Sequence, residues 1–154
     1  TAYRDGKNLD ARNGMAMGAY YAGLAINQVN VGNVHAIAHQ LGGKYGIPHG
    51  LANALVLPHI LEFCRVDAQQ RLAELALVIG AGSAADDTAS LAHKFIKAVR
   101  NLRTEVGIPD QMDVIKHADF ETLTQQAIAE GALYPVPRLL DRDSVIMILN
   151  SIAK

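Results

Sequence analysis

The chain of 154 residues is poor in several residue types that usually mark a specialised class of protein. It has no tryptophan, and aromatic residues make up only 5% of it, although 50% of its residues are hydrophobic. The core must therefore be built mainly from Ala, Leu, Ile and Val, which suits closely packed helices. No apolar run approaches the roughly 20 residues needed to cross a bilayer, so no membrane-spanning segment is expected.

The chain also has only one cysteine and almost no net charge. The single cysteine, Cys64, excludes an internal disulfide and fits a reducing compartment, so a cytoplasmic location is expected. We expect Cys64 itself to be a small buried hydrophobe. The net charge of −1 gives no reason to expect nucleic acid or an anionic membrane as a partner. The chain starts on Thr1 rather than Met, which suggests that it is a fragment of a longer protein.

Helical periodicity is present along the whole chain, whereas no segment has the pattern of a strand. The expected fold class is all-α: a compact bundle of about seven helices in a single domain over residues 1–154. The expected helices run from Leu9 to about Gln28, to about Leu41 after a break at 30–33, from Pro48 to about Cys64, from Ala68 to Ile79, from Thr88 to about Val106, from Asp119 to about Glu130, and from Asp141 or Asp143 onward.

Glycine and proline give more local predictions. Gly14, Gly18 and Gly23 weaken the first helix, so their presence favours a buried central helix that another backbone approaches closely. The stretch 42–46, with three glycines, is expected to be a loop. Pro58 lies about ten residues into the third helix and predicts a kink or a restart there.

The fifth expected helix has a clear amphipathic pattern. Its inner stripe is predicted to contain Leu91, Phe95, Val99 and Leu102. The basic residues Lys94, Lys97, Arg100 and Arg103 are predicted to face solvent.

Histidines are concentrated between residues 35 and 59. His35 and His39 are four residues apart, so both rings leave the same face of a helix. His49 follows across the glycine-rich stretch, near the start of the next helix, whose N-terminus favours a neutral, ligating imidazole. A pair of this kind with a distant third histidine can bind a divalent metal. No Glu lies between His35 and His39, so the metalloprotease motif is absent.

The other histidines are interpreted as structural. His59, which follows Pro58, is expected to pack or to form a hydrogen bond. His93 and His117 lie among charged residues and are expected at the surface.

The stretch from residue 35 to 59 resembles the signature of a known family. The runs HAIAHQLGG at 35–43, PHGLANA at 48–54 and LPH at 57–59 are similar to those of the iron-containing (group III) alcohol dehydrogenases. The similarity extends upstream over Ala22–Ala25 and downstream over Gly107–Pro109 and Val136–Arg138, so that it covers essentially the whole chain.

The resemblance implies what spacing alone does not show. Members have an N-terminal nucleotide-binding domain and a helical C-terminal domain, with a metal bound in the cleft between them by one Asp and three His. Two of these histidines match His35 and His49. His39 matches a histidine that faces the nicotinamide and the reacting carbon, so it is both the catalytic and the cofactor-binding candidate. The remaining ligands and the pyrophosphate loop lie upstream, in a segment that this chain lacks.

The function implied is metal-assisted hydride transfer between a primary alcohol or aldehyde and NAD or NADP. The expected ion is Fe²⁺, with Zn²⁺ as its substitute. The expected partners are a small alcohol or aldehyde, the missing N-terminal domain and further copies of the protein, and the chain alone is expected to be inactive. Two alternatives remain open: a self-contained zinc module of His35, His39 and His49, and a non-catalytic helical dimerisation module.

Overall fold

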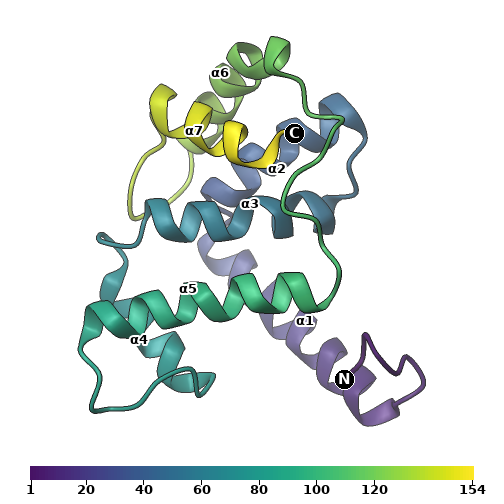
Figure 1. Cartoon of the computed structure of the whole chain (residues 1–154), viewed down its shortest axis with the longest axis vertical. Coiled ribbons are helices and arrows are strands. Elements are labelled where there is room, and N and C mark those ends of the chain that lie inside the picture. The colour runs from purple at the N-terminus through teal and green to yellow at the C-terminus, as the bar shows by residue number, and fades with distance from the viewer. The chain divides into compact units, whose positions relative to one another are not determined.

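A computed structural model describes all residues from Thr1 to Lys154 and is entirely helical in its regular structure (Figure 1). It contains seven α-helices and one short 3₁₀ turn, which confirms the predicted all-α class. In chain order the elements are α1 (Leu9–Val29), α2 (Asn33–Tyr45), α3 (His49–Phe63), α4 (Gln69–Val78), α5 (Thr88–Glu105), η1 (His117–Asp119), α6 (Phe120–Gly131) and α7 (Arg142–Ile152). The chain divides into two compact units, Thr1–Val31 and Gly32–Lys154.

The first unit consists of α1 and the turns before it. Asn8 caps the helix by accepting a hydrogen bond from the backbone N–H of Ala11 at 2.9 Å. No residue of α1 is buried, so the prediction of a buried central helix is wrong for this chain. A Cβ added at any of the three helical glycines would meet nothing within 4 Å.

The second unit has one large apolar core. Four helices, α2, α3, α6 and α7, supply most of the fully buried side chains, which include Leu41, Leu55, Leu123, Ile148 and Leu149. Cys64 belongs to this core, as predicted. Helices α4 and α5 pack on each other around two smaller apolar clusters, and α5 also contacts α3. None of the helices is long and apolar enough to cross a membrane.

Helix α2 is longer than the sequence suggested. It continues through Gly42 and Gly43 to Tyr45 and ends at Gly46, whose φ of 69° is left-handed. The predicted loop at 42–46 is therefore wrong, because packing of the helix on α3 and α6 outweighs the cost of two helical glycines, about 1 kcal/mol each. Only Gly46 needs the conformational freedom of glycine.

Helix α3 runs without interruption through Pro58 to Phe63, so the helix does not restart there. A proline inside a helix removes one backbone hydrogen bond and crowds the preceding turn. Here the Pro58 ring is buried, and α3 is packed against α2, α5 and α7. We infer that burial of this helix on several sides maintains its continuity.

A buried amide fixes the start of α2. Asn33 is 3% exposed, and its Nδ2 donates a hydrogen bond of 2.8 Å to the carbonyl oxygen of Arg138. The same nitrogen lies 4.0 Å from the sulfur of Cys64, at the end of α3. Asn33 thus joins α2 to the end of α3 and to the segment before α7, although 105 residues separate it from Arg138.

Helix α5 presents part of the predicted stripe to the core: Leu91 is buried and Phe95 packs against both small clusters, as predicted. Leu91, Ala92 and Ile96 are buried, whereas Leu102 is 60% exposed. Arg103 was expected in solvent but is 7% exposed, and its guanidinium bonds the Asp110 carboxylate and lies 3.5 Å from the carbonyl oxygen of Leu55. The long side chain can bury its stem while its charge meets polar partners, which hydrophobic periodicity does not register.

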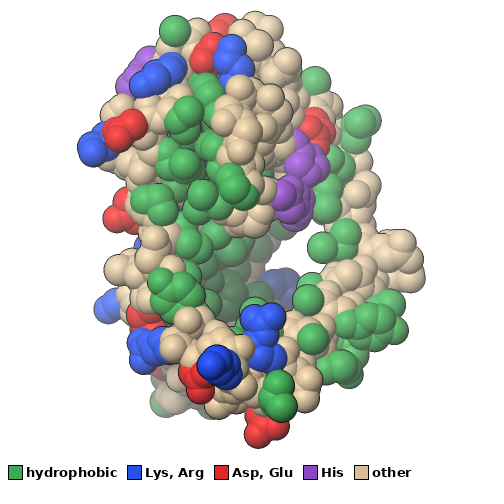
Figure 2. Space-filling model, turned by 90° about the vertical axis from the view of Figure 1, so that its right-hand side faces the viewer, with side chains coloured by type: hydrophobic (Ala, Val, Ile, Leu, Met, Phe, Trp, Pro, Cys, Tyr) green, Lys and Arg blue, Asp and Glu red, His purple; other side chains and the backbone are tan.

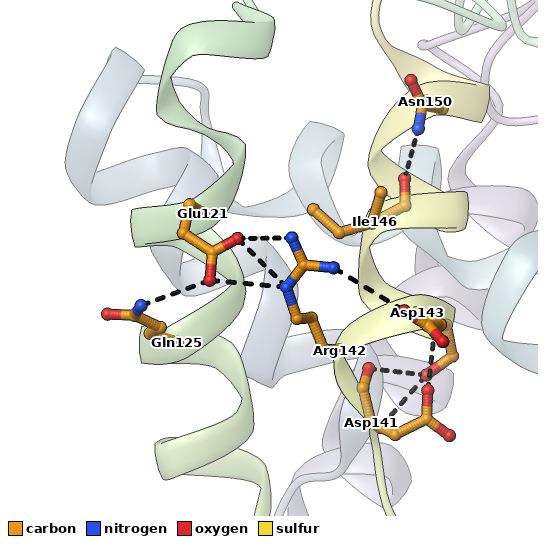
Figure 3. A network of polar contacts seen from close by, with 8 residues as sticks. Glu121, Gln125, Asp141, Arg142, Asp143, Ile146 and Asn150 are labelled. Carbon is orange, nitrogen blue, oxygen red and sulfur yellow. Dashed lines mark hydrogen bonds and ion pairs between the residues drawn. The ribbon is translucent and has the colours of Figure 1, made fainter.

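Charged residues connect α6 and α7 on the surface (Figure 3). Arg142 bonds Glu121 with nitrogen–oxygen distances of 2.8 and 3.1 Å. Asp141 caps α7 in a reciprocal capping box with Ser144. No strand is present, and the only β-type pairing is one isolated bridge between Met112 and Ala153.

Candidate metal centre

Three histidine rings meet where α2 and α3 come together. His35 and His39 project from α2, and His49 is the first residue of α3. The distances between ring centroids are 5.2 Å for His35 and His49, 5.5 Å for His35 and His39, and 5.5 Å for His39 and His49. Figure 2 shows histidine side chains gathered at the surface beside an acidic side chain. The structure thus brings together the three histidines that the sequence singled out.

The spacing of His35 and His49 suits two imidazoles on one ion. With zinc–nitrogen distances of about 2.0–2.1 Å in tetrahedral geometry, two ligating rings have centroids roughly 5 Å apart. His39 and His49 are instead stacked, with 27° between their planes. No group of three or more His, Cys, Asp or Glu side chains is arranged to hold a metal. The residues fit half of a metal site and do not form the closed three-histidine site of the alternative reading.

The electrostatic environment keeps His35 suitable for ligation. Burial lowers the pKa of His35 below its ordinary value, and the neighbouring His39 and His49 lower it further, while Glu130 acts in the opposite direction. A neutral imidazole is the form that binds a metal ion. His35 can therefore act as a ligand near neutral pH without first losing a proton.

His39 contacts a carboxylate from a distant part of the chain. Its Nδ1 lies 2.6 Å from Oε1 of Glu130, which is on the last turn of α6. The same Oε1 accepts a hydrogen bond of 2.6 Å from the Tyr134 hydroxyl, and Oε2 accepts one of 2.7 Å from Gln40. Tyr134 remains a neutral donor, because its hydrogen bond to Glu130 raises the pKa of the phenol to about 12.

His49 has a local partner one turn along α3. Nδ2 of Asn53 lies 3.0 Å from Nε2 of His49 and 2.9 Å from the His49 carbonyl oxygen. This contact assigns the acceptor role to Nε2 and the proton to Nδ1. The amide of Asn53 therefore selects the tautomer of His49.

The remaining histidines lie elsewhere. His93 and His117 are exposed, as predicted, and the His117 ring stacks on Phe120 at 4.7 Å. His59 is half-buried, and its Nε2 has no hydrogen-bond partner, so it packs but does not form the hydrogen bond that was the other expectation. It lines a groove of about 690 Å³ beside α3, α5 and α7, which does not include the three clustered histidines.

Four polar residues around the cluster were not singled out by the sequence: Gln40, Asn53, Glu130 and Tyr134. Gln40 and Asn53 follow His39 and His49 by one and four residues, and helical spacing could have identified Asn53. Glu130 is 91 residues from His39, and only the packing of α6 on α2 joins them. Tyr134 follows Glu130 by four residues but lies beyond the end of α6 at Gly131, so helical spacing does not account for their contact.

Comparison with known proteins identifies the family of this chain. Residues 1–153 match the sequence profile described as the Fe-containing alcohol dehydrogenase family, C-terminal. The chain is 39% identical over 135 residues to 1,3-propanediol dehydrogenase of Klebsiella pneumoniae, which covers 86% of this chain and 35% of that protein. It is 37% identical to alcohol dehydrogenase 4 of Saccharomyces cerevisiae (strain S288c), over 97% of this chain and 38% of that protein.

A crystal structure of a 1,3-propanediol oxidoreductase superimposes with a TM-score of 0.92 at 36% identity, over 97% of this chain and 40% of that one. The fold is therefore that of the helical C-terminal domain of an alcohol dehydrogenase. The chain belongs to the Fe-containing alcohol dehydrogenase family. It spans 35–40% of the length of these relatives.

Proposed function

We propose that this chain is the metal-binding helical part of an NAD- or NADP-dependent enzyme that interconverts a small primary alcohol and its aldehyde. The observation that supports this most directly is the meeting of His35, His39 and His49 at the α2–α3 junction, in a chain of the Fe-containing alcohol dehydrogenase family. The relatives are named as dehydrogenases of alcohols, among them 1,3-propanediol dehydrogenase.

In this proposal His35 and His49 hold Fe²⁺, with Zn²⁺ as its substitute, and residues outside this chain complete the site. A bound divalent ion lowers the pKa of an oxygen that it binds and polarises a carbonyl group. The chain's own contribution is to supply two neutral imidazoles at a fixed spacing. The fit of this pair is supported by the 5.2 Å between their centroids and by the lowered pKa of His35.

His39 is proposed to handle the proton of the substrate hydroxyl and to face the nicotinamide. Nδ1 of His39 is hydrogen-bonded to Glu130, so Nε2 is the nitrogen available to accept or return a proton. The side chain is 40% exposed, which leaves it accessible to a substrate. Alcohol oxidation releases one proton from the hydroxyl, and a general base at this position would receive it.

The rest of the enzyme is proposed to lie outside these residues. We propose that a nucleotide-binding domain precedes the chain, that the complete protein is cytoplasmic and that it forms a homo-oligomer. The greater length of the relatives supports the first of these points. We also propose that the chain alone is inactive, because it has only two ligand histidines and no nucleotide-binding segment.

The test is calorimetric titration of Fe²⁺, under anaerobic conditions, and of Zn²⁺ into this chain. We expect weak and unselective binding, because two imidazoles do not form a complete coordination shell. Replacing His35 or His49 by Ala should weaken binding by about tenfold or more in each case, since outer-sphere changes alone already cost 10–100-fold. The matched control is His93→Ala, which removes an exposed histidine from α5.

Two results would contradict this assignment. One is tight iron binding that survives both single substitutions, because the ion would then be held elsewhere. The other is measurable NAD-dependent alcohol oxidation by the chain alone, which would show that no further domain is needed.

A further inference from the structure

The Glu130 carboxylate is held in place from several sides. Oε1 accepts hydrogen bonds from the Tyr134 hydroxyl and His39, both at 2.6 Å, and Oε2 accepts one from Gln40 at 2.7 Å. The Gln40 amide also donates to the Ala36 carbonyl oxygen at 3.1 Å, so the donor itself is anchored to α2. With three side chains on its two oxygens, the carboxylate has little freedom to turn.

The carboxylate is in its ionised form near neutral pH. Burial by itself would raise the pKa of Glu130, but the hydrogen bonds from Tyr134, His39 and Gln40 outweigh burial, and the pKa lies below its ordinary value. An ionised carboxylate only accepts hydrogen bonds. The contact with His39 therefore requires a proton on Nδ1, and in the neutral ring this leaves a lone pair on Nε2.

No other group in the structure determines which ring nitrogen of His39 carries the proton. The ring is 40% exposed, and Glu130 is its only hydrogen-bond partner. The neighbouring His35 and His49 rings restrict the space around it but do not decide which of its nitrogens carries the proton. An exposed imidazole without a fixed partner would exchange between both tautomers and between rotamers.

We propose that Glu130 is the positioning residue of His39, which fixes the imidazole as the Nδ1–H tautomer and presents Nε2 to the substrate hydroxyl. The proposal deepens the proposed function and rests on it, because it assumes that His39 handles the substrate proton. A carboxylate that orients a histidine in this way is a general device for setting which nitrogen acts as the base. Tyr134 and Gln40 support the device by holding the carboxylate.

The tautomer can be measured directly in this chain. Long-range ¹H–¹⁵N correlation spectra of ¹⁵N-histidine-labelled protein distinguish a protonated from an unprotonated ring nitrogen, and a His39→Gln sample assigns the signals. At a pH well above the ordinary histidine pKa of about 6.5, we expect His39 as the Nδ1–H form. In Glu130→Ala the ratio of Nδ1–H to Nε2–H should fall by about tenfold or more, because a charge-assisted hydrogen bond is lost.

Glu130→Gln keeps the size of the side chain and offers one amide oxygen in place of two carboxylate oxygens. We expect an intermediate tautomer ratio, and this variant carries the test if Glu130→Ala fails to fold. The matched control is Glu121→Gln, on the same helix, whose carboxylate pairs with Arg142 and does not contact His39. It should leave the His39 signals unchanged.

The proposal is overturned if His39 is mainly the Nε2–H form in the unaltered chain. It is also overturned if the folded Glu130→Ala and Glu130→Gln variants both keep the original ratio. This readout is independent of metal binding. A fixed Nδ1–H tautomer together with either of the two contradicting results named above would refute the proposed function alone, whereas metal binding that depends on His35 and His49 with a freely exchanging His39 would refute the positioning role alone.

Discussion

Replacing Leu55 by Ala is expected to lower the free energy of unfolding of the chain by about 2–5 kcal/mol, the range for deleting a fully buried leucine side chain. Leu55 is 0% exposed and lies on α3, which packs against α2, α5 and α7. The loss has two parts. One is the free energy of burying the missing carbon atoms, and the other is the cost of the cavity that they leave among three neighbouring helices. Denaturant unfolding followed by far-ultraviolet circular dichroism measures it.

Leu102→Ala is the matched control for this change. Leu102 is also helical but is 60% exposed, so the same substitution should change the free energy of unfolding by no more than about 0.5 kcal/mol. An equal loss in both variants would mean that the face of α5 assigned here to solvent is covered in solution. A loss below about 1 kcal/mol at Leu55 would contradict its place in a tightly packed core.

Acidification is expected to destabilise the chain through His59. Burial and then the positive charges of Arg100 and Arg103 lower the pKa of His59 to about 4. In the unfolded chain the pKa is about 6.5, so between these values the unfolded state binds more protons and the folded state is favoured less as the pH falls. The contribution is fully present above about pH 6.5 and is lost by about pH 4.

A shift of this size corresponds to about 3 kcal/mol at 1.36 kcal/mol per pKa unit. Because His59 lines a groove that is open to water, we expect about 1–2 kcal/mol. The measurement is the free energy of unfolding of the unaltered chain, His59→Gln and His59→Leu at several values between pH 4 and pH 7. Both variants should depend less on pH, whatever their stability at pH 7, and a slope equal to that of the unaltered chain would show that another group is responsible.

The sequence allowed the number and type of helices to be predicted, because hydrophobic periodicity and capping residues are local signals. The predictions that failed concerned residues whose local preference is overruled by packing. Gly42 and Gly43 are poor helix formers but lie in α2, and Pro58 is a helix breaker but lies within α3. A sequence pattern shows the cost of such a residue and not the tertiary contacts that offset it.

The candidate site was predictable to the extent that its ligands are close in the sequence. His35 and His39 share a helical face, and His49 returns at the next helix, so the three rings could be expected to meet. Glu130 could not be expected there, because no local rule relates residues from α2 and α6. The resemblance to a family indicated His35 and His49 as donors for the proposed ion, whereas the contacts around the three histidines required the structure.

The hydrogen bond of the Asn33 amide anchors the start of α2, and His35 and His39 lie at different distances from that anchor. His35 lies two residues from Asn33, whereas His39 lies more than one turn further along. The side chain proposed to hold an ion thus lies close to the anchored start of α2, whereas His39 depends for its position on a carboxylate from α6.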